Sequence, residues 1–207
     1  MNNKNIFSIL GATLIVCLLF AFTLKKDGYE PGDEATDFKL KNIDNSMVSL
    51  KNYKDAKGFV VVFTCNHCPF AIKYEDRLNA LDAKYKQVGY PVIAINPNDT
   101  VQYPDDAFSE MKVRAQEKGF TFPYLIDETQ KIAKTYGALK TPHVYILQKA
   151  GNKLVVKYVG AIDDNYDDET KVTQKYAANA LDELIAGKEV AVKTTKAIGC
   201  SIKWKKD

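Results

Sequence analysis

The sequence predicts an α/β protein with a central mixed β-sheet flanked by helices. Apolar runs of strand length alternate with segments of helical period up to residue 143, which is the pattern of βαβ winding. Two further apolar runs then follow each other across the turn at 150–152 and predict an antiparallel edge. About 180 residues remain after an apolar leader, enough for one domain with a sizeable core.

The chain opens with targeting sequence. Residues 6–24 are almost unbroken apolar sequence, as in secretory signals. The stretch is also long enough to span a bilayer, so a cleaved signal peptide and a membrane anchor both stay open. Cys17 within it is expected to be an apolar filler. In either case we expect export, with the domain periplasmic or membrane-anchored and facing the periplasm. The predicted division is a leader at 1–24, a domain at 25–187 and a C-terminal tail at 188–207.

The first part of the domain predicts a hairpin, a buried strand and a long helix. After a polar linker at 25–35, apolar residues flank the turn-like segment 44–46 and predict an N-terminal β-hairpin. The continuous Val/Phe run within 59–64 predicts a strand buried on both faces. From Pro69 onward, apolar residues recur at intervals of three and four. This spacing predicts a helix over 69–86.

Acids and glycines mark the boundaries of the later elements. Pro104 is followed by two aspartates, which favour a helix start. Gly119 and Gly137 each follow a helical pattern, where a closing glycine is common. The expected strands lie at 92–95, 124–126, 143–147 and 154–159, and the expected helices at 104–119, 128–136 and 169–186.

The segment Cys65-Asn66-His67-Cys68-Pro69 carries the strongest chemical signal. It places a dithiol at a strand-to-helix junction, the usual setting of a redox-active pair. The unpaired N–H groups and the dipole at a helix start favour a thiolate, and Pro69 is tolerated at the opening position. We expect an exposed Cys65 to be the nucleophile and a more buried Cys68 to close the disulfide. His67 is expected to lower the thiol pKa further.

Other interpretations of the cysteines stay open. A structural zinc site would need a second close pair of ligands, and the sequence has none. A copper-handling site could use Cys65, Cys68 and His143, because thiolates select Cu(I). Cys200 in the tail is a candidate resolving thiol, a pairing partner for another protein, or a buried inert residue. Three acids of the long helix, Glu75, Asp76 and Asp82, are expected on its solvated outer face.

The bulk composition argues against several classes of partner. The chain is 46% hydrophobic and 27% charged, with a net charge of +3, which is ordinary for a globular protein. A small, dispersed charge predicts no nucleic-acid partner. No cofactor is expected. Contact with a membrane is expected only through the N-terminal segment, if it is not cleaved.

Several short motifs give the chain a family resemblance. They are Thr64–Phe70, Ile95–Asp99, Tyr103–Asp106, Phe122–Leu125, Thr141-Pro142 and Gly199–Trp204. With these motifs, residues 34–165 resemble the thioredoxin-like redoxins, which join the peroxiredoxins (the AhpC/TSA class) with periplasmic thiol–disulfide oxidoreductases. More narrowly, the motifs look like the peroxiredoxin-like subgroup often called PRX-like.

The resemblance implies a thioredoxin-like fold with an N-terminal hairpin extension. It implies that Thr141 and Pro142 form a cis peptide beside the sulfurs, as a docking edge for substrate. The leading hypothesis is therefore an exported thiol–disulfide oxidoreductase that uses Cys65 and Cys68 on protein clients and exchanges electrons with a redox partner. Whether it reduces or oxidises its clients is not read from the sequence.

A thiol peroxidase is the alternative enzyme. Peroxiredoxins place the peroxidatic cysteine at the position of Cys68, within a Pro-x-x-x-Thr-x-x-Cys pattern. Here residue 61 is Val, and the threonine is residue 64, one position before the place that the pattern needs, so that Pro-Thr pair is not in place. Thr64 is instead expected to support the dithiol from the end of the preceding strand.

Overall fold

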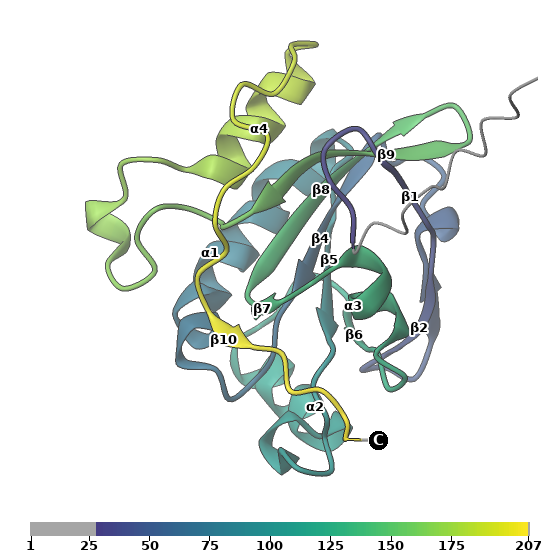
Figure 1. Ribbon diagram of the computed structural model, residues 1–207, viewed down its shortest axis with the longest axis vertical. Coiled ribbons are helices and arrows are strands. Elements are labelled where there is room, and N and C mark those ends of the chain that lie inside the picture. The colour runs from purple at the N-terminus through teal and green to yellow at the C-terminus, as the bar shows by residue number, and fades with distance from the viewer. Residues whose placement is uncertain (1–27, 207) are drawn as a thin grey trace, which may run out of the picture.

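The computed structural model describes residues 28–206, and within them a mixed eight-stranded sheet runs through the centre (Figure 1). Its order is β1-β9-β8-β4-β5-β6-β2-β3. The central strands β4, β5 and β6 are parallel, and all other pairings are antiparallel. The strands are β1 (Glu34–Ala35), β2 (Lys39–Asn42), β3 (Met47–Ser49), β4 (Gly58–Phe63), β5 (Val92–Asn96), β6 (Tyr124–Ile126), β8 (His143–Ala150) and β9 (Lys153–Gly160).

These features confirm the predicted fold class, the N-terminal hairpin β2–β3 and the antiparallel edge β8–β9. The leader at 1–24 and Cys17 lie outside the described residues. No helix within residues 28–206 combines the length and the apolar character that a membrane crossing needs. The boundary predicted between the domain and the tail stays a prediction.

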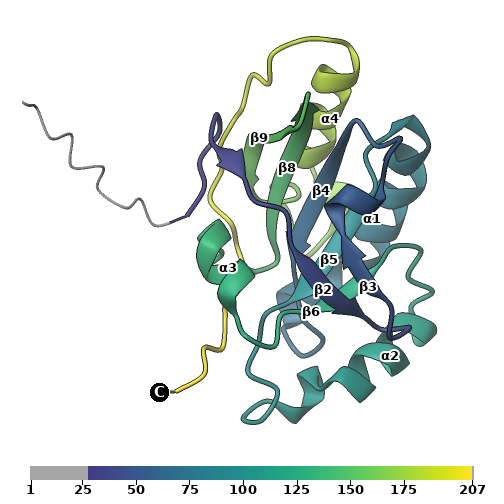
Figure 2. The same cartoon turned by 90° about the vertical axis from the view of Figure 1, so that its right-hand side faces the viewer.

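Two apolar cores lie on opposite faces of the sheet. Side chains alternate along β4, so that Val60 and Val62 enter one core and Phe59, Val61 and Phe63 the other. Such a strand is buried on both faces, as its continuous apolar run predicted. Three helices cover the first face and one short helix covers the second (Figure 2). The helices are α1 (Pro69–Tyr85), α2 (Phe108–Glu117) and α4 (Tyr176–Ile185) on the first face, and α3 (Lys131–Tyr136) on the second.

Three predicted helices are shorter than their sequence patterns. The one expected over 128–136 begins only at Lys131, as α3. The one expected over 104–119 is a 3-10 turn at Pro104–Asp106, followed by the extended residue Ala107 and then α2. The one expected over 169–186 is interrupted because Thr173 turns its N–H and hydroxyl to the Asp164 carboxylate. Side-chain hydrogen bonds of this kind compete with the helical pattern.

Both ends of the described chain are more ordered than expected. The predicted linker at 25–35 contributes β1, which pairs with β9. The tail contributes β10 (Cys200–Ser201), which forms a separate antiparallel pair with β7 (Lys140–Thr141). In Figure 1 this yellow segment runs beside β7 and ends near α2. Part of the predicted C-terminal tail is therefore a β-strand paired with the segment before Pro142.

The acids of α1 are also placed differently from the prediction. Asp76 is exposed, as expected. Glu75 is buried and makes two short bonds to the Arg114 guanidinium, at 2.6 and 2.7 Å. Asp82 is fully buried and accepts from the Val92 N–H at 3.0 Å. The prediction failed at these two positions because α2 and β5 supply partners from outside the helix.

Candidate functional site

The two cysteines of the candidate site follow β4 directly and precede α1. Cys68 is the N-cap residue of α1, and Pro69 takes the first helical position. Thr64 is buried at the end of β4, where its N–H donates to Ile95 O at 2.9 Å. The strand, the loop and the helix start thus fix both sulfurs relative to the sheet.

Both sulfurs are covered. Cys65 is 3% exposed and Cys68 is 0% exposed. The expectation of an exposed Cys65 is therefore wrong for this conformation. The physical reason is the tail, because Cys200 packs against the apolar cluster that Cys65 and Cys68 form with Ala71.

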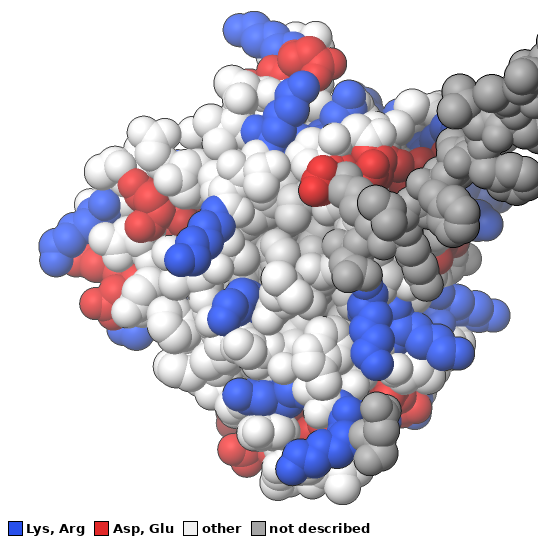
Figure 3. All heavy atoms as spheres, viewed as in Figure 1, with Lys and Arg blue, Asp and Glu red and all other residues white. Residues whose placement is uncertain are grey.

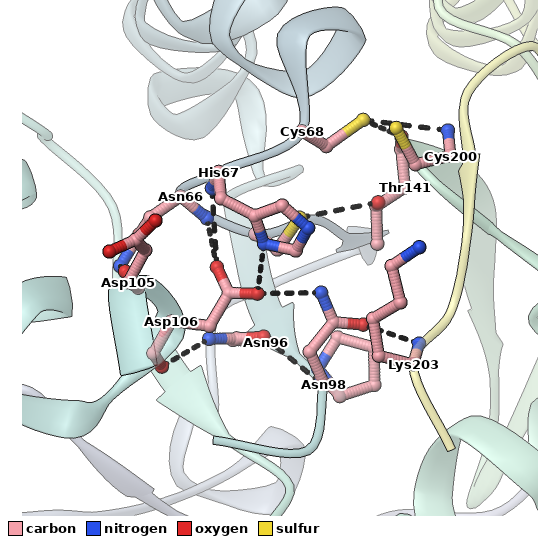
Figure 4. Close-up of polar contacts among 12 residues, drawn as sticks. Asn66, His67, Cys68, Asn96, Asn98, Asp105, Asp106, Thr141, Cys200 and Lys203 are labelled. Carbon is pink, nitrogen blue, oxygen red and sulfur yellow. Dashed lines mark hydrogen bonds and ion pairs between the residues drawn. The ribbon is translucent and has the colours of Figure 1, made fainter. Parts of the chain in front are cut away.

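The sulfurs meet the segment that precedes β8 (Figure 4). Cys65 Sγ lies 3.3 Å from Thr141 Oγ1, and the Cys68 thiol donates to Thr141 O at 3.1 Å. The Thr141–Pro142 peptide bond is cis, as the resemblance implied. Cys65, Cys68 and Cys200 are all free thiols. The structure therefore brings the predicted dithiol and the predicted docking segment into direct contact.

The two thiols differ in acidity because they share one hydrogen bond. Its donor is Cys65, so this bond raises the pKa of Cys65, and burial and the nearby Asp106 charge act in the same direction. The same bond lowers the pKa of Cys68 well below its usual range, and contacts from Cys200 support this shift against the opposing effect of burial. In this conformation Cys68 is therefore the thiol that ionises more readily.

A buried carboxylate organises the loop between the cysteines. Asp106 is 0% exposed and accepts from the N–H groups of Asn66 and His67, at 2.7 and 3.2 Å. Its other oxygen accepts from Asn98 Nδ2 at 2.7 Å and lies 2.5 Å from His67 Nδ1. The His67 ring also stacks on Tyr103, with ring centroids 5.4 Å apart. His67 is thus fixed beside the dithiol, as Figure 4 shows.

Asp106 is the site residue that sequence reasoning missed. Its position after Pro104 indicated only an acid in a first helical turn. A signal was present, because Asp106 and Asn98 belong to two of the motifs that carry the family resemblance. The hydrogen bond between Asn98 and Asp106 joins two loops, and no pattern within either loop predicts it.

The copper set considered from the sequence is not brought together. His143 Nδ1 instead accepts from the Leu139 N–H and contacts the Tyr145 hydroxyl, both at 3.4 Å. Burial lowers the pKa of His143 to about 4. Within residues 28–206, the potential ligands that gather are Cys65, His67 and Asp106, within 4.8 Å of one another. Because both oxygens of Asp106 already serve the loop, this cluster is better explained as loop structure.

Comparison with known proteins adds the family. The model of the AhpC/TSA family matches residues 31–158. The chain belongs to the AhpC/TSA family. Among curated relatives of this redoxin, the thiol-disulfide oxidoreductase ResA of Bacillus thuringiensis subsp. konkukian is 30% identical over 155 residues, which cover 72% of this chain and 84% of the relative. The protein of the same name from Bacillus anthracis is also 30% identical, covering 75% and 84%.

Solved structures agree on the architecture. An uncharacterized conserved protein of Geobacillus kaustophilus superposes with a TM-score of 0.79 and 41% identity, covering 86% of this chain and 93% of that one. The peroxidoxin BcpB of Mycobacterium tuberculosis superposes at 0.57 with 17% identity, covering 76% and 97%. At that identity the likeness shows the fold alone. The fold of this redoxin is thioredoxin-like.

Proposed function

We propose that this redoxin is a thiol–disulfide oxidoreductase whose redox couple is Cys65 and Cys68. The observation that carries the proposal is the contact of both sulfurs with Thr141, directly before the cis Pro142. Two further findings support it. The pair shares a hydrogen bond that favours one thiolate, and the curated relatives cited above are named thiol-disulfide oxidoreductases.

The reaction balances without a cofactor. A thiolate of the pair attacks a client disulfide, a mixed disulfide forms, and one client sulfur leaves and takes up a proton. The second cysteine of the pair loses its proton and attacks the mixed disulfide, which releases the second client sulfur. The couple ends as the Cys65–Cys68 disulfide and the client as a dithiol. The reverse sequence oxidises a client.

The roles of the two cysteines follow from their acidity. Cys68 supplies the thiolate, because its pKa is lowered and that of Cys65 is raised. Cys65 acts as the second cysteine. His67 and Asp106 are positioning residues that fix the loop between them. Thr141 and Pro142 provide the edge along which a client segment docks once β10 has left it.

The clients and the location belong to the same proposal. Protein disulfides or dithiols are the expected clients, and a separate protein resets the couple. The apolar stretch at 6–24 supports export, with the described domain facing the periplasm. Whether the couple reduces or oxidises its clients depends on its reduction potential. A potential of about −270 mV would make the protein a reductant, and one of about −120 mV an oxidant.

Turnover of a protein disulfide tests the proposal. The full chain, in detergent and recycled by dithiothreitol, should accelerate insulin disulfide reduction. Cys65→Ser and Cys68→Ser should each remove the acceleration, whereas the matched control Cys17→Ser, in the leader, should keep it. Full activity in either site variant would contradict the assigned couple.

A thiol peroxidase is a second candidate, favoured by the lowered pKa of Cys68 and by the AhpC/TSA family. Hydrogen peroxide consumption separates the two. Rapid peroxide turnover that survives Cys65→Ser but not Cys68→Ser would place the peroxidase first. Loss of turnover in both variants, or none in the native chain, would keep the exchange of disulfides as the function.

A further inference from the structure

The tail strand occupies the edge of the candidate site and is held on both sides of Cys200. In the antiparallel pair β7–β10, Cys200 lies opposite Thr141. On one side, Ile202 N–H donates to Leu139 O at 3.2 Å and Lys203 N–H donates to Asn98 Oδ1 at 2.9 Å. Ile202 is 4% exposed and belongs to the core on the α3 face. The position of Cys200 is thus determined by the fold.

The segment before Cys200 is anchored as firmly. Thr195 N–H donates to Val159 O at 3.0 Å, and its hydroxyl lies 2.6 Å from the Tyr158 hydroxyl. Gly199 allows the close approach to β7, because a Cβ at this residue would lie 2.2 Å from Thr141 O. The tail therefore packs directly on the peptide that faces the two sulfurs.

Cys68 stands between two other sulfurs. On one side it accepts the hydrogen bond from Cys65. On the other side, the Cys200 N–H donates to Cys68 Sγ at 3.4 Å, and the Cys200 side chain is in hydrogen-bond contact with the same sulfur. Cys200 is half-buried, while Cys65 and Cys68 are buried. Figure 4 shows Cys68 and Cys200 pointing toward one another.

We propose that Cys200 is a third redox residue, which exchanges with the Cys65–Cys68 disulfide to form a Cys68–Cys200 disulfide. This inference rests on the proposed function, because it needs an oxidised Cys65–Cys68 couple to start from. Cys200 attacks the Cys68 sulfur of that disulfide, because the structure places this sulfur against Cys200.

The exchange is balanced within the chain. Cys200 loses its proton and its sulfur attacks Cys68 Sγ. The bond between Cys65 and Cys68 breaks, and its electron pair stays on Cys65, which takes up a proton. There is no net oxidation: one disulfide replaces another. The result is a disulfide at the half-exposed edge strand, where a redox partner can reach it, and a free Cys65 beneath.

The electrostatics around Cys200 favour this order of events. Burial and, after it, the neighbouring Cys68 raise the pKa of the Cys200 thiol, while Lys203 and Lys140 act in the opposite direction, and the net result is a pKa of about 11. Once Cys68 is in a disulfide it carries no charge, so its contribution disappears and those of the two lysines remain. Oxidation of the couple therefore makes Cys200 more acidic at the moment it is needed.

The test uses the full-length Cys65→Ser/Cys17→Ser variant, in which Cys200 is the one cysteine left to resolve an adduct on Cys68. The protein is treated with oxidised glutathione, the remaining thiols are alkylated, and the disulfides are mapped by mass spectrometry. Glutathione joins Cys68 first, and Cys200 then displaces it. We expect a Cys68–Cys200 disulfide, with at least about tenfold less glutathione on Cys68 than in the matched variant that also carries Cys200→Ser, because neighbouring thiols act at high effective concentration.

A second variant tests the geometry. Gly199→Ala in the Cys65→Ser/Cys17→Ser background should slow formation of the Cys68–Cys200 disulfide, since the added Cβ collides with Thr141 O. Equal glutathione occupancy of Cys68 with and without Cys200 would overturn the proposal. This readout uses no client, so it can fail while insulin reduction succeeds, and it can succeed while insulin reduction fails.

Discussion

The low pKa of Cys68 depends mainly on hydrogen bonds from the two other cysteines of the site, Cys65 and Cys200. It is fully buried, and burial alone would raise its pKa. The hydrogen bond from Cys65 outweighs this effect. The identity of residue 65 therefore sets the reactivity of residue 68, which a CxxC motif alone does not reveal.

This dependence can be measured with two substitutions of one residue. Cys65→Ala removes the donor, so the pKa of Cys68 should rise, whereas Cys65→Ser retains a hydroxyl donor and should keep it low. A lowered pKa means that the thiolate is present at neutral pH and is lost as the pH falls through that value. The rate of Cys68 alkylation against pH gives the two curves. Coincident curves would show that the Cys65 hydrogen bond is not the cause.

Asp106 both holds the loop between the cysteines and raises the pKa of Cys65. Asp106→Asn should leave a buried backbone N–H of the loop poorly paired, at a cost of about 2 kcal/mol in the free energy of unfolding. It should also lower the pKa of Cys65, because the Asp106 charge contributes to raising it. The matched control is Asp105→Asn, since Asp105 is exposed and contributes its backbone carbonyl to Asn66.

Denaturant unfolding and the pH dependence of Cys65 alkylation check the two parts separately. If Asp105→Asn and Asp106→Asn behaved alike in both measurements, the role given to the buried carboxylate would be refuted.

Among the secondary-structure elements, local patterns predicted what lies at the centre of the sheet and missed what long-range contacts decide. The Val/Phe run within 59–64 and the CxxC segment gave β4, the start of α1 and the dithiol, because these depend on adjacent residues. Burial of Glu75 depends on Arg114, and the place of Cys200 depends on Thr141. No periodicity within one segment encodes partners so far away in the chain.

The Glu75–Arg114 pair should be the strongest polar tie between α1 and α2. Glu75 is 4% exposed, so Glu75→Gln leaves a guanidinium without its carboxylate. We expect a loss of about 2–3 kcal/mol in unfolding free energy, below the range of about 3–5 kcal/mol for a fully buried pair because Arg114 keeps some contact with solvent. The neighbouring exposed Asp76→Asn should change it by less than about 0.5 kcal/mol. Equal effects in thermal or urea unfolding would contradict this.

The tail strand should act as a cover for the dithiol. Gly199→Ala places a Cβ against Thr141 O and displaces β10. Alkylation of Cys65 and Cys68 by iodoacetamide should therefore be faster than in the native chain. Lys196→Ala, an exposed change in the same tail, should leave the rate as it was. An unchanged rate in Gly199→Ala would show that the sulfurs are shielded by other parts of the fold.

In the molecule as a whole, the chain folds back so that its last described residues lie against the cysteines that follow β4. Acidic and basic side chains are interspersed over the face along which the tail runs (Figure 3). The contacts that hold β10 are hydrogen bonds and apolar burial, with Ile202 in one core. The position of the tail should accordingly depend little on salt.

The tail also carries the only tryptophan of the chain, Trp204. Its ring is partly exposed and lies under the Lys134 ammonium, with the nitrogen 5.6 Å from the ring centroid. If β10 separated from β7, the indole would move away from the Lys134 ammonium and into water. The protein thus has a native optical probe: its ultraviolet emission can report, without any label, when the lid over the sulfurs lifts.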